Sequence, residues 1–323
     1  MISYNDDARK FLGVDVWHKL GYTGKGIAVG SGERYDDEGS HGWMVKTVIN
    51  EVAPDATVHY IPIHDEAMQY SMFSDKRLDE MDELGVSVWT VSVTGFTPSS
   101  KTFPEKFLDS LKRRIHFAAI GNDGTHDPGG MPNSPHFYGV GAIRISNWNG
   151  QPEREPFSSY SDHLDFMCWD EWSMWDHPLD SEGTSFASPA LAGMCALVNQ
   201  FFLKKAGHVL SSEEMYRFLK DNTTDMQVEG WDRPTGWGYV TLPHPSKINV
   251  SKYTTIAKKE NSIMFPDTRT HWAKDVINQC KEWGVVNGRD DGKFHPNDNM
   301  TRAEYCQSVV NLIESIKAGK IKI

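Results

Sequence analysis

Apolar segments of two kinds alternate along most of this sequence, from residue 14 to about residue 240. Short strand-like runs such as 27-IAV-29 and 115-IHFAAIG-121 are separated by longer helix-like runs, of which 186-FASPALAGMCALVNQFF-202 is the most apolar. This alternation is typical of βαβ units, in which helices cover both faces of a parallel sheet. The sequence therefore predicts an α/β domain with a doubly wound, mostly parallel sheet.

Composition excludes several classes of function. The 323-residue chain has 33 Lys and Arg against 44 Asp and Glu, a formal net charge of −11, which argues against a nucleic-acid partner. The N-terminal residues lack the basic region and apolar core of a signal peptide, and no segment is expected to span a membrane. Four scattered cysteines show neither metal-ligand nor disulfide spacing. We expect an acidic soluble protein without a metal site.

The strongest local motif is 183-GTSFASPALAG-193, in which a serine stands between a glycine turn and a helix. Backbone N–H groups and the macrodipole at a helix N-terminus favour developing negative charge, which suits the nucleophile of an acyl transfer. Thr184 and Ser185 have an equally good interpretation as ordinary helix caps. Spacing alone leaves both interpretations open.

Two further motifs contain side chains that could take part in such chemistry. In 117-FAAIGNDG-124 an apolar strand ends at Asn122, whose amide could donate a hydrogen bond to an oxyanion, although an ordinary asparagine turn has the same pattern. His41 is followed by Gly42 and a strongly apolar run, so we expect its imidazole at a helix N-terminus, beside the C-terminal edge of the sheet. Neither residue establishes catalysis alone.

Together the three motifs resemble the subtilisin-like serine proteases. The order His-Gly-x-x-Val, Ala-x-Gly-Asn-x-Gly and Gly-Thr-Ser-x-Ala-Ser-Pro follows this family, and the resemblance covers roughly residues 12–245. It implies a serine endopeptidase in which Ser185 is the nucleophile, His41 the general base and then acid, and Asn122 the oxyanion donor. It also implies an extended peptide or protein substrate, bound between two short segments by β-augmentation. These segments are Ser92, Val93 and Thr94 on one side and Ala119, Ile120 and Gly121 on the other.

The family's third catalytic residue is missing at its usual place. The first core strand of the family ends in an aspartate, and the matching position here is Gly30. Between Gly30 and His41 the sequence has four acids, Glu33, Asp36, Asp37 and Glu38. Any of these loop acids could hold the histidine, because the chemistry requires only a carboxylate near the non-reacting imidazole nitrogen, and Asp37 and Asp36 are the preferred candidates. The alternatives are a weakened Ser-His pair and a pseudoprotease that serves as a binding or scaffold protein.

The C-terminal part of the sequence has a different pattern. Residues 246–262 lose the apolar periodicity and are predicted to link a peptidase domain, 1–245, to a helix–loop–helix module, 263–323. Residues 265–310 resemble a single S-layer homology domain, a class that binds anionic cell-wall polysaccharide. The resemblance makes Trp272 a candidate for contact with a sugar and Arg302 for contact with a charge. A core position for Trp272 and a surface ion pair for Arg302 are equally open.

Cofactors, assembly and location are less constrained. The loop 289–299 lacks EF-hand spacing, so no metal ligands are assigned, and only a structural calcium ion in the main domain is left open. Wall binding by this class commonly uses three units, so one copy implies weak attachment or a trimer. The missing export signal indicates a cytoplasmic or phage-borne protein, whereas the S-layer homology resemblance indicates the cell surface.

Overall fold

The computed structural model describes residues 5–34, 37–63, 74–93, 105–126, 136–146, 149–174, 182–254, 265–268, 273–289, 291–318 and 321. The chain divides into two compact units, Met1–Tyr253 and Thr254–Ile323. The candidate catalytic residues all belong to the first unit.

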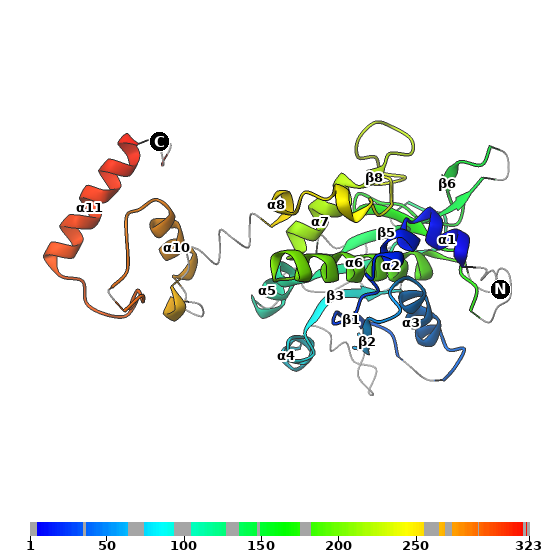
Figure 1. The fold of residues 1–323 in the computed structure, drawn as a ribbon, viewed down its shortest axis with the longest axis horizontal. Coiled ribbons are helices and arrows are strands. Elements are labelled where there is room, and N and C mark those ends of the chain that lie inside the picture. The colour runs from blue at the N-terminus through cyan, green and yellow to red at the C-terminus, as the bar shows by residue number, and fades with distance from the viewer. Residues whose placement is uncertain are drawn as a thin grey trace. The chain divides into compact units, whose positions relative to one another are not determined.

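The first unit is built around one mostly parallel sheet (Figure 1). Its strands are β1 (Ala28–Ser31), β2 (Thr57–Tyr60), β3 (Val86–Val91), β4 (Ile115–Ala119), β5 (Tyr138–Ile145), β6 (Pro152–Arg154), β7 (Leu164–Trp169), β8 (Thr223–Thr224) and β9 (Tyr239–Val240). Their order is β2-β1-β3-β4-β5-β7-β9-β8, with β6 paired to β5. Among the strand pairs that the structure describes, β5–β6 and β8–β9 are antiparallel and the others are parallel.

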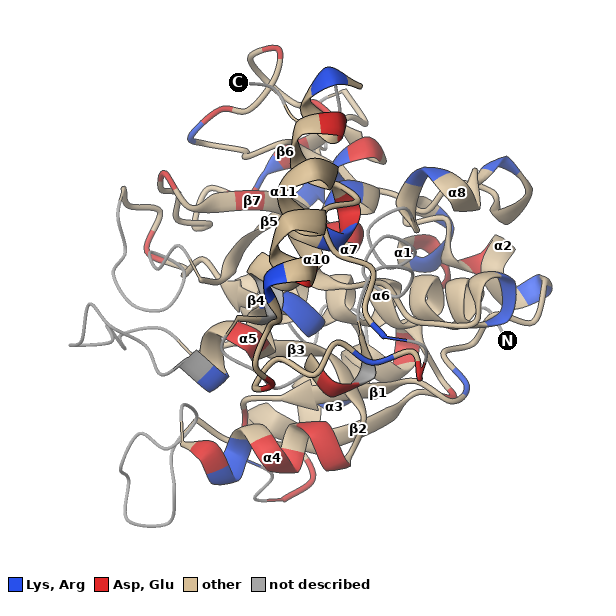
Figure 2. Ribbon diagram, turned by 90° about the vertical axis from the view of Figure 1, so that its left-hand side faces the viewer, with Lys and Arg blue, Asp and Glu red and all other residues tan. Residues whose placement is uncertain are grey.

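Helices lie on both faces of this sheet, which confirms the predicted fold class. They are α1 (Asp6–Phe11), α2 (Val14–Lys19), α3 (His41–Val52), α4 (Asp75–Glu83), α5 (Glu105–Arg113), α6 (Thr184–Ala206), α7 (Ser212–Asp221) and α8 (Val250–Tyr253). One core joins β1 residue Val29 to α3 and α6, and a second joins β3 residue Trp89 to α4 and α5. Acidic residues dominate α4, as the red ribbon in Figure 2 shows.

Helix α6 runs through the centre of the first unit and contacts strands β1, β3, β4, β5 and β7. By length and composition it could cross a membrane, contrary to the expectation that no segment would. However, 94% of its most apolar window is buried inside the protein. A helix that is apolar on all sides can equally be the core helix of a globular domain, and its burial assigns α6 to that class.

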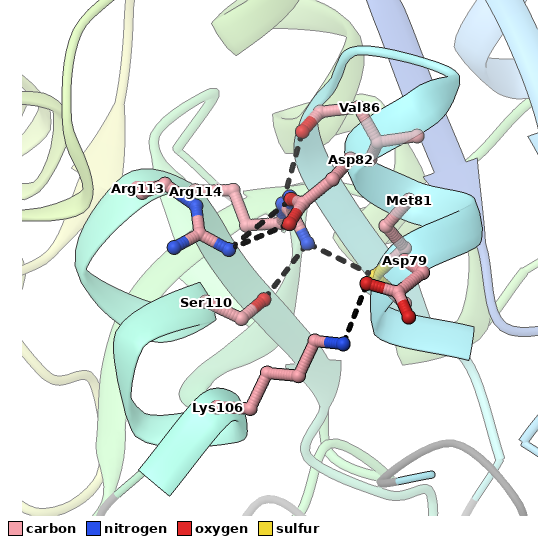
Figure 3. Close-up of polar contacts among 8 residues, drawn as sticks. All are labelled: Asp79, Met81, Asp82, Val86, Lys106, Ser110, Arg113 and Arg114. Atoms are coloured by element: carbon pink, nitrogen blue, oxygen red, sulfur yellow. Dashed lines mark hydrogen bonds and ion pairs between the residues drawn. The ribbon is translucent and has the colours of Figure 1, made fainter. Parts of the chain in front are cut away.

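Arg114, just after α5, ties α4 and α5 to the sheet (Figure 3). Its buried guanidinium donates to the Val86 carbonyl (3.0 Å) and to Ser110 Oγ (2.8 Å), and it pairs with Asp82 of α4. Burial lowers the Arg114 pKa, and the Asp82 carboxylate opposes that shift. Asp82 also pairs with Arg113 (2.9 Å). These bonds satisfy a buried charge that would otherwise be costly.

Part of the predicted linker packs on the first unit. Residues Pro245–Lys247 form the 3-10 helix η2, and α8 follows directly. The Tyr253 ring lies 5.1 Å from the Phe218 ring and 6.1 Å from the Phe202 ring, centroid to centroid. Aromatic packing of this kind holds the beginning of the predicted linker on the first unit.

The second unit contains η3 (Pro266–Thr268), α10 (Lys274–Glu282) and α11 (Arg302–Lys317). The Phe265 and Phe294 rings lie 5.3 Å apart, and the Asp267 carboxylate accepts hydrogen bonds from two backbone N–H groups of the loop, beginning at Phe294 (3.0 Å). Thr301 and Glu304 form the predicted capping box at the start of α11. Local sequence signals therefore account for much of this small unit.

Candidate active site

His41 begins α3, and its imidazole contacts a buried carboxylate. Nδ1 lies 3.1 Å from Oε2 of Glu33, whose side chain is only 5% exposed. The other carboxylate oxygen, Oε1, accepts a hydrogen bond from the Ser92 backbone N–H (2.7 Å). A carboxylate fixed at Nδ1 keeps a proton on that nitrogen and leaves Nε2 as the basic nitrogen.

Gly42 allows the segment that carries Glu33 to approach the first turn of α3 closely. A Cβ atom at position 42 would overlap the carbonyl oxygen of Arg34 and would lie 3.2 Å from Cβ of Glu33. Only a residue without a side chain lets the segment after β1 pass so close to the first turn of α3. The glycine of the His-Gly motif therefore positions the acid as well as the helix.

The acid expected from sequence was a different residue. Asp37 is exposed, and Asp36 lies outside the described residues. The structure places Glu33, rather than Asp37, on the imidazole. The segment from β1 to His41 is short, and Glu33 is the acid that lies where it leaves the sheet.

The alternation of side chains along β1 explains why the acid does not stand at position 30. Successive residues of a strand point to opposite faces of the sheet. Val29 belongs to the core shared with α3, whereas a Cβ at Gly30 would lie 2.6 Å from Trp89 Cδ1, in the core under α4 and α5. Side chains at positions 29, 31 and 33 therefore point to the face of the sheet that α3 and His41 cover. The alternation of side chains along the strand, followed from Val29, leads to Glu33.

Ser185 lies in the first turn of α6, close to His41. The Phe186 ring, next in sequence, is centred 6.1 Å from the imidazole. The Ser185 hydroxyl donates to the Ser92 carbonyl (3.2 Å), and Ser92 Oγ donates to the Ser185 carbonyl (2.8 Å). Ser92, which also bonds Glu33, thus connects the acid to the serine, a role that the sequence did not indicate.

Asn122 is fixed by Thr184. Its Oδ1 accepts from the Thr184 backbone N–H (3.0 Å) and hydroxyl (2.8 Å). The amide nitrogen Nδ2 is then the donor that remains, and a Cβ at Gly183 would lie 3.1 Å from it. The N-cap of α6 is Gly183, without a side-chain cap. The Thr184 and Ser185 hydroxyls thus bond to the site rather than cap the helix.

The predicted substrate-binding segments follow β3 and β4, which are adjacent parallel strands. Ala119, Ile120 and Gly121 are buried, and Val93 is half-buried. Thr94 lies outside the described residues, and the Ser92 N–H is already bonded to Glu33. In the second unit, Arg302 is exposed on α11 and Trp272 lies outside the described residues. The contacts of the described residues do not test these binding roles, which stay predictions.

Two family descriptions match the chain. Residues 25–238 match the Subtilase family, and residues 265–306 match the S-layer homology domain. The chain belongs to the subtilase family. Both resemblances drawn from the sequence are thereby confirmed, and the first unit is the subtilase domain.

Solved structures show the same fold for this subtilase. A lanthipeptide protease has 16% identity and a TM-score of 0.54, covering 71% of this chain and 93% of that one. The prenylagaramide maturation protease PagA, at 18% identity and TM-score 0.54, covers 71% and 95%. MycP1 without its propeptide, also 18% and 0.54, covers 76% and 96%.

Curated relatives share only a small region with this chain. The exoglucanase XynX of Acetivibrio thermocellus is 29% identical over 89 residues, 28% of this chain and 7% of the relative. A cellulosome-anchoring protein of the same species is 37% identical over 67 residues, 20% of this chain and 14% of the relative. The chain thus spans well under two thirds of these relatives.

Asp170 supports the turn before the nucleophile of the subtilase domain. It is fully buried, and its Oδ2 accepts from the Gly183 backbone N–H (2.7 Å). Burial raises its pKa to about 8, with smaller contributions from nearby glutamates. Among the described residues no group of three or more His, Cys, Asp or Glu is arranged to hold a metal ion. Asp170 is therefore not explained as a metal ligand.

Replacement of Asp170 by Asn should change the pH dependence of stability. The folded-state pKa of about 8 exceeds the ordinary value of 3.8, so protonated Asp170 stabilises the fold below pH 4, and this contribution is lost as the pH rises toward 8. Asn keeps an acceptor for Gly183 without the ionisation. The difference in free energy of unfolding between Asp170→Asn and the wild type should therefore shift in favour of the variant by on the order of several kcal/mol from pH 4 to pH 8. Denaturant unfolding of both proteins across this pH range measures the difference. Free energies of unfolding that change with pH in the same way in both proteins would refute the expectation.

Replacement of Asn122 by Leu should lower kcat by about 10²- to 10³-fold with little change in KM, because an oxyanion donor acts mainly in the transition state. Steady-state kinetics on a chromogenic peptide measures this loss. Asp123→Asn, at the adjacent exposed position, is the matched control and should stay within about twofold of the wild type. Unchanged kcat in Asn122→Leu would remove Asn122 from the mechanism.

Proposed function

We propose that the subtilase domain is a serine endopeptidase that hydrolyses peptide bonds through an acyl-enzyme on Ser185. The observation that carries the proposal is the contact between Glu33 and His41. It supplies the orienting carboxylate that Gly30 does not provide, beside a serine at a helix N-terminus and a fixed amide donor.

The proposed steps follow from these contacts. As the Ser185 hydroxyl attacks a peptide carbonyl, Nε2 of His41 takes its proton, and Glu33 stabilises the imidazolium through Nδ1–H. Asn122 Nδ2 and the Ser185 backbone N–H donate to the tetrahedral oxyanion. The imidazolium then protonates the leaving amine. Water, activated by His41 in the same way, attacks the acyl-enzyme and releases the carboxylic acid product and free Ser185.

The position of the Ser185 hydroxyl requires one rearrangement. It donates to Ser92 rather than to His41, so it has to rotate toward Nε2 before attack. Catalytic hydrogen bonds are often long or misaligned before substrate binds. The same hydrogen bond is the observation that favours the second candidate, a non-catalytic subtilase domain that holds a peptide in its cleft.

A fluorophosphonate probe distinguishes the two candidates, because it reacts covalently only with an activated serine. We expect labelling of the full chain, and loss of labelling in Ser185→Ala and in His41→Ala. Replacement of the exposed Ser251 by Ala is the control and should label like the wild type. An unlabelled wild type with a normal circular dichroism spectrum would overturn the endopeptidase proposal.

For the second unit, we propose attachment to anionic cell-wall polysaccharide. S-layer homology domains bind cell walls, which supports a location at the cell surface. One of the similar proteins is named as a cellulosome-anchoring protein. Arg302 and Trp272 are the proposed contacts, and one domain copy would attach weakly or act within a trimer. Co-sedimentation of the full chain with purified wall polysaccharide tests the proposal; a chain that stays in the supernatant refutes it.

A further inference from the structure

A pocket of about 700 Å³ opens in the first unit, and its lining includes Glu182, which directly precedes the turn before the proposed nucleophile. Its walls include three acids, one basic residue and one aromatic ring: Glu155, Glu171, Glu182, Arg144 and Phe157. Neither the matched family descriptions nor the proposed catalytic steps assign it a role.

Two parts of the pocket lining adjoin the segments that would hold the oxyanion. On one side, the Phe157 carbonyl accepts from the Gly124 backbone N–H (2.6 Å), and Ser159 Oγ accepts from the Asp123 N–H (3.2 Å). These bonds attach the pocket wall to the Asn122 turn. On the other side, Glu182 directly precedes Gly183 in the turn before the nucleophile. Residues next to both proposed oxyanion segments therefore form part of the pocket lining.

The carboxylates outnumber the cation that could neutralise them. Arg144 pairs with Glu153 (2.9 Å) and, more distantly, with Glu155 (3.5 Å). Glu171 and Glu182 form no ion pair within the part of the chain that the structure describes.

A fourth carboxylate lies close to the pocket acids. Asp170 interacts electrostatically with Glu155, Glu171 and Glu182. Its buried Oδ1 has no hydrogen-bond partner among the described residues. Because the Asp170 carboxyl is mostly protonated at neutral pH, the negative charge of the region comes from the three glutamates, and Asp170 adds a buried carboxyl oxygen without a partner among the described residues.

We propose that this pocket receives a lysine or arginine side chain of the substrate, on the leaving-group side of the scissile bond. The assignment rests on the proposed function. The acyl half of the substrate is expected between Ser92–Val93 and Ala119–Gly121, which precede Asn122, whereas the pocket wall at Phe157 bonds to Gly124, which follows Asn122. The Phe157 ring offers an apolar wall for the aliphatic stem of the basic side chain.

The protonation behaviour of the pocket acids agrees with a cationic ligand. Burial raises the pKa of Glu155, which Arg144 partly offsets, and burial followed by the charge of Glu182 raises the pKa of Glu171. A cationic side chain would offset this repulsion and favour the ionised carboxylates. Binding of a basic residue should therefore be coupled to proton release.

The test uses peptides that differ at one position after the scissile bond, with Lys, Gln or Glu there. Their affinity for the folded Ser185→Ala chain is measured by fluorescence anisotropy, so the assay does not depend on turnover. We expect the Lys peptide to bind about tenfold more tightly than the Gln peptide at low salt, because two unpaired carboxylates contribute. The Glu peptide should bind most weakly.

Charge-neutralising variants identify the source of that preference. Glu171→Gln and Glu182→Gln should each reduce the Lys-over-Gln ratio by about threefold, and the double variant should abolish it. Glu229→Gln, at an exposed position outside the pocket, is the matched control and should keep the full ratio. Affinity for the Gln peptide should stay constant in all variants.

The results separate the two proposals. Equal affinity for the Lys and Gln peptides, or a Lys preference that survives the double variant, would overturn the pocket assignment. A preference that appears only when Lys precedes the scissile bond would also overturn it. Failure of the wild type to react with the fluorophosphonate probe overturns the endopeptidase proposal instead, whatever the peptides show.

Discussion

Replacement of Glu33 by Gln should lower kcat for peptide hydrolysis by about 10⁴-fold, the loss seen when a triad carboxylate becomes an amide. Glu33 contacts Nδ1 of His41 with one oxygen and the Ser92 N–H with the other. An amide of the same size can preserve the packing. However, its NH₂ group can face Nδ1, which places the imidazole proton on Nε2 and removes the base.

Single-turnover kinetics of Glu33→Gln, with circular dichroism as a check on folding, measures this loss. Asp37→Asn is the matched control, because Asp37 is an exposed acid in the same segment. It should stay within about twofold of the wild type. If Asp37→Asn were the more damaging change, the carboxylate that works in solution would be the one preferred from sequence, and the contact with Glu33 would have no catalytic role.

The fold was largely predictable because the sequence pattern that specifies it is local. Apolar runs of strand and helix length alternate along the chain, and each became an element of the sheet or of its covering layers. The long-range contacts that hold the two ends of the first unit in place were not predictable in this way. Trp17 Nε1 donates to the Pro243 carbonyl (2.8 Å), and Tyr253 packs on Phe218. Such contacts join residues far apart in sequence, and neither partner has a distinguishing local pattern.

The candidate site was predictable where a motif contains the side chain that matters. Ser185, His41 and Asn122 each stand in a short motif at the end or start of an element. Ser92 was not assigned its connecting position, because two of its contacts use backbone groups and depend on how β3 faces α6. Glu33 stood among the four candidate acids but was not preferred, because the sequence alone does not show that it lies on the His41 side of the sheet, opposite to Gly30.

Replacement of Gly42 by Ala should reduce kcat by at least about 10²-fold, because displacement of a catalytic group by about 1 Å has an effect of this size. The added methyl group would overlap the Arg34 carbonyl and crowd Cβ of Glu33. Since α3 packs into the main core through Val45, Val48 and Val52, the helix should stay in place and the segment carrying Glu33 should move. His41 would then lose its carboxylate without any change in a charged residue.

A double-mutant cycle separates this positioning role from general damage to the fold. If Gly42 acts through Glu33, adding Gly42→Ala to Glu33→Gln should cost less than about threefold further in kcat, because the contact is already lost. Asn50→Ala, on the same helix, is the control and should be neutral in both backgrounds. Additive losses from Gly42→Ala and Glu33→Gln would mean that Gly42 affects the site by another route. A strongly non-additive cycle would show that this subtilase couples its His-Gly motif to its acid through one close backbone contact.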